Sequence, residues 1–161
     1  MAVTAPTPQE LSPEARAEAI AALPERIAFF DGVCSFCDGT VKWLVAHDPE
    51  QRLHFAPLQG ETAATVRAGF PDRFPVDIDT FVYLEPGDDF AGRRIHLRSE
   101  AVFALADDLG GELRWITRFR WLPRWLTDLA YRLFASNRYR MFGKLEACDV
   151  PTPADRARLL P

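Results

Sequence analysis

The first two thirds of the chain alternate between short apolar runs and segments in which apolar residues recur every three or four positions. Residues 27–30 are continuously apolar and too few for an independent helix, which favours a strand buried on both faces. The next apolar positions recur at helical spacing: Cys37, Val41, Leu44 and Val45. Asp48 and Pro49 then interrupt the pattern. We therefore expect a strand, a loop and a helix, in that order.

Further elements follow from the same patterns. A short helix over 13–23, with Ser12 as its cap, is expected ahead of the first strand. Behind the central helix, the pattern predicts a strand over 52–56, a helix over 61–68 ended by Gly69, strands over 80–84 and 93–97 joined by a turn at 85–88, and a helix capped by Ser99 and ended by Gly110 and Gly111. The order βαβαββα indicates an α/β fold with a small mixed sheet and helices on both faces.

The last 50 residues have a different character. Aromatic residues alternate there with arginines: Trp115, Phe119, Trp121, Trp125, Tyr131, Phe134, Tyr139 and Phe142 among Arg114, Arg118, Arg120, Arg124, Arg132, Arg138 and Arg140. We expect helices over 124–135 and 137–144. The expected organisation is a tail and short helix over 1–25, a core domain over 26–111, and a C-terminal helical cap and tail over 112–161 that packs as part of the same domain.

Composition and charge narrow the class of protein. The chain has 161 residues, of which 48% are hydrophobic and 26% charged, which suits one globular domain. Residues 1–111 carry 9 basic and 18 acidic side chains, whereas residues 112–161 carry 10 and 5. The first 26 residues lack a basic start and an unbroken apolar core, and no stretch is long and apolar enough to span a membrane, so we expect a cytoplasmic protein.

Two of the three cysteines, Cys34 and Cys37, lie at the predicted junction of strand and helix. At a helix N-terminus, unpaired backbone N–H groups and the helix dipole stabilise a thiolate. Cys34 would then be the nucleophile and Cys37, one turn later, the thiol that resolves the mixed disulfide. The alternatives are structural cysteines that pack as small apolar residues, and a metal site.

Several separated segments resemble the DCC family of thiol-disulfide oxidoreductases, named for an Asp-x-x-Cys-x-x-Cys signature. They are FFDGVCSFC, FAPLQ at 55–59, TFVYLE at 80–85, and NRYRMFGKLEAC followed by PTP at 137–153. The resemblance covers about residues 26–153. It implies a thioredoxin-like fold, which agrees with the predicted order of elements, and thiol-disulfide exchange.

Asp31 matches the first position of that signature. Its carboxylate could accept a proton from Cys37 during resolution, or it could bond the backbone amides of the Asp31-Gly32 turn. The third cysteine, Cys148, lies in the C-terminal segment of the resemblance. It could pair with Cys34, complete a metal site or simply be a packed thiol.

Basic residues of the C-terminal segment and the histidines are further candidates for a site with the cysteines. Arg138, Arg140 and Lys144 match basic positions of the family's tail, where they could stabilise a thiolate or serve as solvated charges. A metal site would need the three cysteines plus one histidine, from the set His47, His54 and His96. No second Cys-x-x-Cys supports it.

The resulting hypothesis is a thiol-disulfide oxidoreductase that needs no organic cofactor, because the dithiol itself carries two electrons. Its partners would be a protein or small-molecule thiol or disulfide and an unidentified electron donor. The alternative is a non-catalytic thioredoxin-like adaptor that docks a partner or a membrane protein through its aromatic and basic C-terminal segment. We expect the aromatic residues of that segment to pack on the sheet, with peripheral membrane contact or docking of a partner as the second interpretation. Nucleic acid is not expected, since the isoelectric point is near 5.4.

Overall fold

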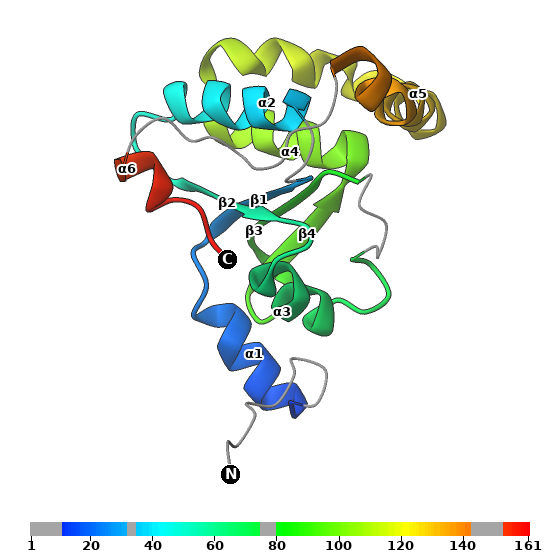
Figure 1. Ribbon diagram of the computed structural model, residues 1–161. Helices are drawn as coiled ribbons and strands as arrows, with labels where there is room; N and C mark the ends of the chain where they lie inside the picture. Colours follow the sequence, from blue (N-terminus) through cyan, green and yellow to red (C-terminus); the bar gives the residue numbers. More distant parts are fainter. Residues whose placement is uncertain (1–10, 32–34, 75–79, 143–152) are drawn as a thin grey trace.

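A four-stranded mixed sheet forms the centre of the fold in a computed structural model that describes residues 11–31, 35–74, 80–142 and 153–161 (Figure 1). The strands are β1 (Arg26–Phe30), β2 (Leu53–Pro57), β3 (Val82–Phe90) and β4 (Arg93–Leu97). Their spatial order is β2-β1-β3-β4. β1 runs parallel to β2 and antiparallel to β3, and β3 pairs antiparallel with β4. This mixed sheet is the one that the order of elements predicted.

Helices cover both faces of the sheet, as expected. They are α1 (Pro13–Ala21), α2 (Ser35–Ala46), α3 (Glu61–Gly69), α4 (Arg98–Leu109), the 3₁₀ helix η1 (Gly111–Trp121), α5 (Arg124–Phe142) and the short α6 (Pro153–Arg156). Figure 1 shows α2, α4 and α5 on one side of the sheet, with α1 and α3 on the other. The fold is thus a two-sided α/β arrangement of thioredoxin-like type.

The core is divided by the alternation of side chains along β1. Ile27 and Phe29 lie in one apolar cluster with residues of α1 and α3, whereas Ala28 and Phe30 lie in the other with residues of α2 and α4. All four are buried, which confirms the prediction of a strand covered on both faces. The second cluster, on the side of α2, is the one that borders the cysteine motif.

Asp108, near the end of α4, connects that helix to the sheet. It accepts hydrogen bonds from Arg26 Nε at 2.7 Å and from the Tyr83 hydroxyl at 2.7 Å. Burial and the hydrogen bond to Asp108 both raise the pKa of Tyr83, because they favour its neutral form. α4 is therefore fixed to β1 and β3 by polar contacts as well as by packing.

The hairpin of β3 and β4 forms as predicted, but the turn was predicted at the wrong residues. Pro86, expected within a turn at 85–88, instead pairs with Arg93, and the chain reverses at Ala91 and Gly92. Both residues have positive φ, at 52° and 71°, as a two-residue hairpin turn requires. The register shifts between Pro86 and Phe90, so a bulge absorbs the residues that the sequence pattern assigned to the turn.

Two predictions about helix ends and continuity are wrong. Ser99 does not cap α4, whose N-cap is Leu97; its hydroxyl instead donates to Asp128 Oδ1 of α5 at 2.7 Å. The helices expected over 124–135 and 137–144 are one continuous helix, α5, as far as Phe142. Residues 143 and 144 lie outside the described residues. Ser99 thus joins α4 to α5 through a side-chain hydrogen bond.

The expectation that the aromatic residues of the C-terminal segment pack on the sheet holds for one side of α5 only. Phe134 and Tyr131 face inward, where they line a cavity above the sheet. Trp121 and Trp125 are exposed at 80% and 68%, so the prediction is wrong for them. The reason is that both faces of this segment are apolar, and the sheet can cover just one of them.

The C-terminal residues attach to the edge of β2. Phe55 N–H donates to the Arg158 carbonyl at 2.9 Å, and Leu160 N–H donates to the Phe55 carbonyl at 2.8 Å. Arg158 forms a buried ion pair with Asp48, and Asp48 also accepts from Leu53 N–H at 2.9 Å. The described C-terminal residues are therefore held against the edge of the sheet by backbone hydrogen bonds and a buried ion pair.

Candidate functional site

The cysteine motif lies where β1 ends and α2 begins. β1 ends at Phe30, Asp31 follows, and α2 starts at Ser35, so residues 32–34 connect the C-terminal end of a central strand to a helix N-terminus. Cys37 is in the first turn of α2. Cys34 and Cys148 lie outside the described residues. The strand and the helix that the sequence predicted on either side of residues 32–34 are both observed.

Asp31 is a buried carboxylate at this junction, with 2% of its surface exposed. Its Oδ1 accepts a hydrogen bond from Gln59 Nε2 at 3.1 Å. Gln59 follows β2, and Leu58 N–H donates to the Phe30 carbonyl at 2.8 Å, which extends the parallel ladder to this point. The ends of β1 and β2 thus bring the acidic residue of the motif together with an amide from the segment after β2.

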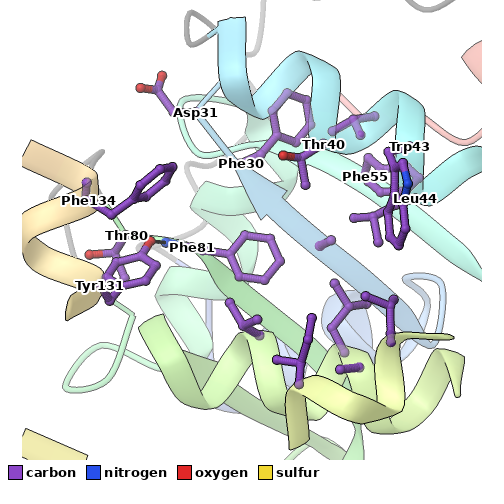
Figure 2. Close-up of a pocket in the computed structure, with 18 residues that line it drawn as sticks. Phe30, Asp31, Thr40, Trp43, Leu44, Phe55, Thr80, Phe81, Tyr131 and Phe134 are labelled. Carbon is purple, nitrogen blue, oxygen red and sulfur yellow. Dashed lines mark hydrogen bonds between the residues drawn. The ribbon is translucent and has the colours of Figure 1, made fainter. Parts of the chain in front are cut away.

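A cavity of about 300 Å³ lies beside this junction, between the sheet and its covering helices. Its walls are almost entirely apolar. They include Phe30, Phe55 and Phe81 from the sheet side, Val41, Trp43 and Leu44 from α2, Val102, Leu105 and Ala106 from α4, Leu113 and Ile116 from η1, and Phe134 and Ala135 from α5. Figure 2 shows Trp43 and Leu44 at one end and Asp31 at the other. The volume and the lining are typical of a site for a small apolar group.

The few polar groups of the cavity come from separate parts of the chain. Asp31 follows β1 and Thr80 precedes β3, so both lie at the same end of these antiparallel strands. Tyr131 comes from α5. Figure 2 shows Thr80 and Tyr131 close together at the end toward the tip of β1. The Tyr131 hydroxyl accepts a hydrogen bond from Phe81 N–H at 2.6 Å. Tyr131 therefore holds α5 against the start of β3 while it lines the cavity.

Of the basic residues that the sequence predicted to assist the cysteines, the structure describes the side chain of Arg140 alone. Arg140 is exposed near the end of α5; Arg138 is on the same helix, but its side chain, like Lys144, falls outside the described part. Arg140 does not line the cavity beside the junction, and the roles of all three basic residues stay predictions.

The predicted histidine ligands lie in three different places. His47 directly follows α2, whereas Cys37 is in the first turn of that helix, and the His47 ring stacks on Trp43. His54 lies in β2, and His96, in β4, is 2.8 Å from a Glu85 oxygen. Within residues 11–31, 35–74, 80–142 and 153–161, no group of three or more histidine, cysteine or acidic side chains could hold a metal ion.

Three residues of the site were not predicted to have a role: Gln59, Thr80 and Tyr131. Gln59 and Thr80 both fall within segments that carry the family resemblance, but their proximity to Asp31 and to the cavity depends on how the strands pair. Tyr131 could be found as the polar member of the inner face of α5. No sequence motif marks it.

The four-stranded mixed sheet, with a dithiol motif between its first strand and the following helix, defines a thioredoxin-like protein. The chain belongs to the DCC1-like thiol-disulfide oxidoreductase family, whose model matches residues 28–144. Membership indicates a redox role with thiol or disulfide substrates.

Two relatives support this assignment. The uncharacterized protein YuxK of Bacillus subtilis is 34% identical over 142 residues, which cover 86% of this chain and 96% of YuxK. The DCC family protein At1g52590, chloroplastic, of Arabidopsis thaliana is 32% identical over 127 residues, or 77% of this chain and 69% of that protein. No solved structure matches. Among the described residues, none of the helices has the length and apolarity to cross a membrane.

Proposed function

We propose that this protein is a thiol-disulfide oxidoreductase in which Cys34 attacks a disulfide and Cys37 resolves the product. The observation that carries the proposal is the position of the motif between the end of β1 and the N-terminus of α2. Four backbone N–H groups at a helix start lack intrahelical acceptors, and together with the dipole they favour a thiolate over a thiol. This lowers the thiol pKa and raises the fraction of the attacking form.

The exchange proceeds in two steps, each of which is an attack of a thiolate on a disulfide. The Cys34 thiolate attacks one sulfur of the substrate disulfide, so that a mixed disulfide forms and the first substrate thiolate leaves. The Cys37 thiol then loses its proton and attacks the Cys34 sulfur, which releases the second substrate thiolate. The substrate gains two electrons and the protein keeps a Cys34–Cys37 disulfide. A thiol reductant must reduce that disulfide before the next turnover.

Asp31 is our candidate for the group that accepts the proton of Cys37. It is buried, it directly precedes the loop, and Gln59 donates to one of its oxygens. That hydrogen bond holds the carboxylate in place at the end of β1. General bases of this kind contribute roughly 10²- to 10⁴-fold to rates. We therefore expect Asp31→Asn to slow the resolution step more than the first attack.

The apolar cavity is our candidate for the substrate's binding site. It begins at Asp31 and extends between α2, α4 and α5, so a group attached to the reacting sulfur would enter it. Walls of phenylalanine, leucine and valine favour an aliphatic or aromatic substituent over a charged one. The preferred substrates would thus be disulfides with an apolar group next to the sulfur, on a small molecule or on a protein side chain.

The test is the reduction of a small disulfide by the purified protein with a recycling thiol. We expect Cys34→Ser to abolish activity, and Cys37→Ser to trap a mixed disulfide that mass spectrometry detects. Cys148→Ser is the matched control, because it removes a thiol outside the motif, and it should retain the wild-type rate. A double Cys34→Ser/Cys37→Ser protein that keeps the full rate would overturn the proposal.

Two further measurements separate an active dithiol from an inert one. The alkylation rate of Cys34 as a function of pH should give an apparent pKa below that of a free thiol, which is about 8.5. The reduction potential of the Cys34–Cys37 pair then distinguishes a reductant from an oxidant on one scale. A Cys34 that reacts no faster at neutral pH than a peptide thiol would contradict the proposed activation.

A further inference from the structure

The outer side of η1 and α5 carries large apolar side chains that are exposed to solvent. Trp115, Trp121 and Trp125 are exposed at 60%, 80% and 68%. We refer to the following residues as the outer apolar surface: Trp115, Phe119, Trp121, Trp125, Leu126, Leu129 and Leu133. Single exposed apolar residues are ordinary on a protein, but a group of this size marks an interaction site.

α5 is apolar on two opposite faces. Its inner face packs over the cavity through Tyr131 and Phe134. Its outer face carries Trp125, Leu129 and Leu133, which recur every four residues and so share one side of the helix. A helix that only covered a sheet would need the first face alone. The second face therefore requires a separate explanation.

The exposed residues of η1 and α5 form one continuous surface. Phe119 of η1 and Leu126 of α5 line the same shallow groove, together with Leu122 between them. Trp115 extends the surface along η1, because its ring packs edge-on against Phe119 at 5.9 Å between centroids. Figure 1 shows α5 at one end of the helical layer.

Arginines surround this surface. Residues 113–142 contain seven arginines and one carboxylate, Asp128, which accepts the hydrogen bond from Ser99. Arg120 and Arg124 pair with Asp107 and Glu100 of α4. The remaining arginines with described side chains are exposed and form no ion pair with a described residue: Arg114, Arg118, Arg132 and Arg140. The segment is thus strongly positive in a chain whose net charge is −4.

We propose that the outer apolar surface docks on an anionic lipid bilayer. Tryptophan and leucine on one helix face, with flanking arginines, are the composition of helices that lie in the membrane interface. The tryptophans would enter the region between headgroups and acyl chains, while the arginines contact lipid phosphates. The acidic remainder of the chain, with 18 acidic and 9 basic side chains in residues 1–111, would face away from the bilayer.

Charge complementarity favours a bilayer over a protein partner. An acidic protein would need carboxylates placed to match individual arginines, whereas a bilayer presents a uniform negative surface to all of them. The exposed leucine and tryptophan side chains lie on η1 and α5 beside a shallow groove that Phe119, Leu122 and Leu126 help to line. Such a surface fits a deformable lipid interface, which needs no matching pocket.

The test is binding of the full-length protein to vesicles of phosphatidylcholine mixed with phosphatidylglycerol, compared with vesicles of phosphatidylcholine alone. We expect cosedimentation with the anionic vesicles, a blue shift of tryptophan emission, and weaker binding at high salt. Binding should be unchanged in Cys34→Ser, because docking does not depend on the proposed redox function.

Two sets of variants locate the contact. Trp121→Ser/Trp125→Ser changes exposed side chains only, so it should fold normally and bind at least tenfold more weakly. Arg114→Ala/Arg118→Ala should weaken binding about 25-fold, since each arginine near an anionic surface contributes about fivefold. Arg94→Ala/Arg156→Ala is the control with the same change in net charge, outside the outer apolar surface, and should bind like the wild type.

Four results would overturn the proposal. The first is the absence of binding to anionic vesicles. The second is equal binding to neutral vesicles, and the third is equal weakening by the Arg94/Arg156 control. The fourth is a stable dimer in sedimentation velocity that Trp125→Ser dissociates, because the outer apolar surface would then be covered by a second copy of the chain.

Discussion

At the scale of single residues, His54 is a half-buried histidine whose ionisation opposes folding. Burial lowers its pKa, and the positive charge of Arg158 lowers it further. The unfolded chain therefore binds a proton at a higher pH than the folded one, near pH 6.5. Between that value and the folded pKa, the free energy of unfolding falls as the pH falls, because protonation favours the unfolded state.

The prediction is that His54→Gln reduces the acid sensitivity of the fold. Urea unfolding of the wild type should show a lower free energy at about pH 5.5 than at about pH 7.5, and the difference should be smaller in the variant. His47→Gln removes an exposed histidine and should leave the difference nearly unchanged. An equal pH dependence in wild type and His54→Gln would contradict this assignment.

Asp31 and Gln59 illustrate what sequence reasoning can find at this scale. Asp31 was identified from the family signature and its position before the cysteines. Its hydrogen bond to Gln59 depends on the pairing of Phe30 with Pro57, which aligns the ends of two strands that are separated in the chain. A spacing pattern carries no information on that alignment, so the partner could not be predicted.

At the scale of elements, the ion pair between Asp48 and Arg158 attaches the C-terminal segment to the connection between α2 and β2. Both side chains are buried, at 1% and 6% exposure. Arg158 Nε also donates to the Leu53 carbonyl at 2.8 Å. Removal of one partner leaves an uncompensated buried charge, which costs about 3–5 kcal/mol. The pair therefore has a large effect on stability if either side chain is lost.

We predict that Arg158→Ala lowers the free energy of unfolding by about 3–5 kcal/mol, measured by urea denaturation. Arg156→Ala, two residues earlier and exposed, should change it by no more than about 0.5 kcal/mol. In Asp48→Ala/Arg158→Ala the loss should be smaller than the sum of the single losses, because neither charge remains unpaired. A loss below about 1 kcal/mol in Arg158→Ala would show that the C-terminal segment contributes little.

The type of each element could be predicted because burial sets the spacing of apolar residues along a helix or a strand. The ends of elements and the positions of turns were harder to predict. Gly87, in the expected turn, instead lies within β3, where a Cβ would be 2.4 Å from Arg94 Cβ. A glycine is needed at position 87 because the neighbouring strand approaches closely there. The positive φ values needed for the turn occur instead at Ala91 and Gly92. The two uses of glycine look alike in a sequence.

At the scale of the whole molecule, α5 has an apolar face on each of two opposite sides. Its inner side closes the cavity next to the cysteine motif, and its outer side forms the outer apolar surface. The sequence indicated an aromatic and basic C-terminal segment, but the choice between a covering helix and a docking surface depends on which face meets the sheet. Since both faces are apolar, only the tertiary arrangement decides it.

The cavity leads to a prediction about substrate preference. Burial of each methylene contributes about 0.8 kcal/mol, so a butyl group in the cavity would gain up to about 3 kcal/mol, or roughly 100-fold in kcat/KM. Dibutyl disulfide should therefore be reduced with a much higher kcat/KM than bis(2-hydroxyethyl) disulfide. Absence of activity on both would count against the redox function, whereas equal activity would count against the cavity alone.

Ala135→Phe should remove that preference, because residue 135 is buried on the inner side of α5 and lines the cavity. The larger ring would fill space that the butyl group needs, so kcat/KM for dibutyl disulfide should fall at least tenfold while that for the hydroxyethyl compound is retained. Ser136→Phe places the same ring on the exposed side of the same helix and should leave both rates unchanged. Thermal unfolding of both variants establishes that a lost rate reflects the filled cavity and not a loss of folded protein.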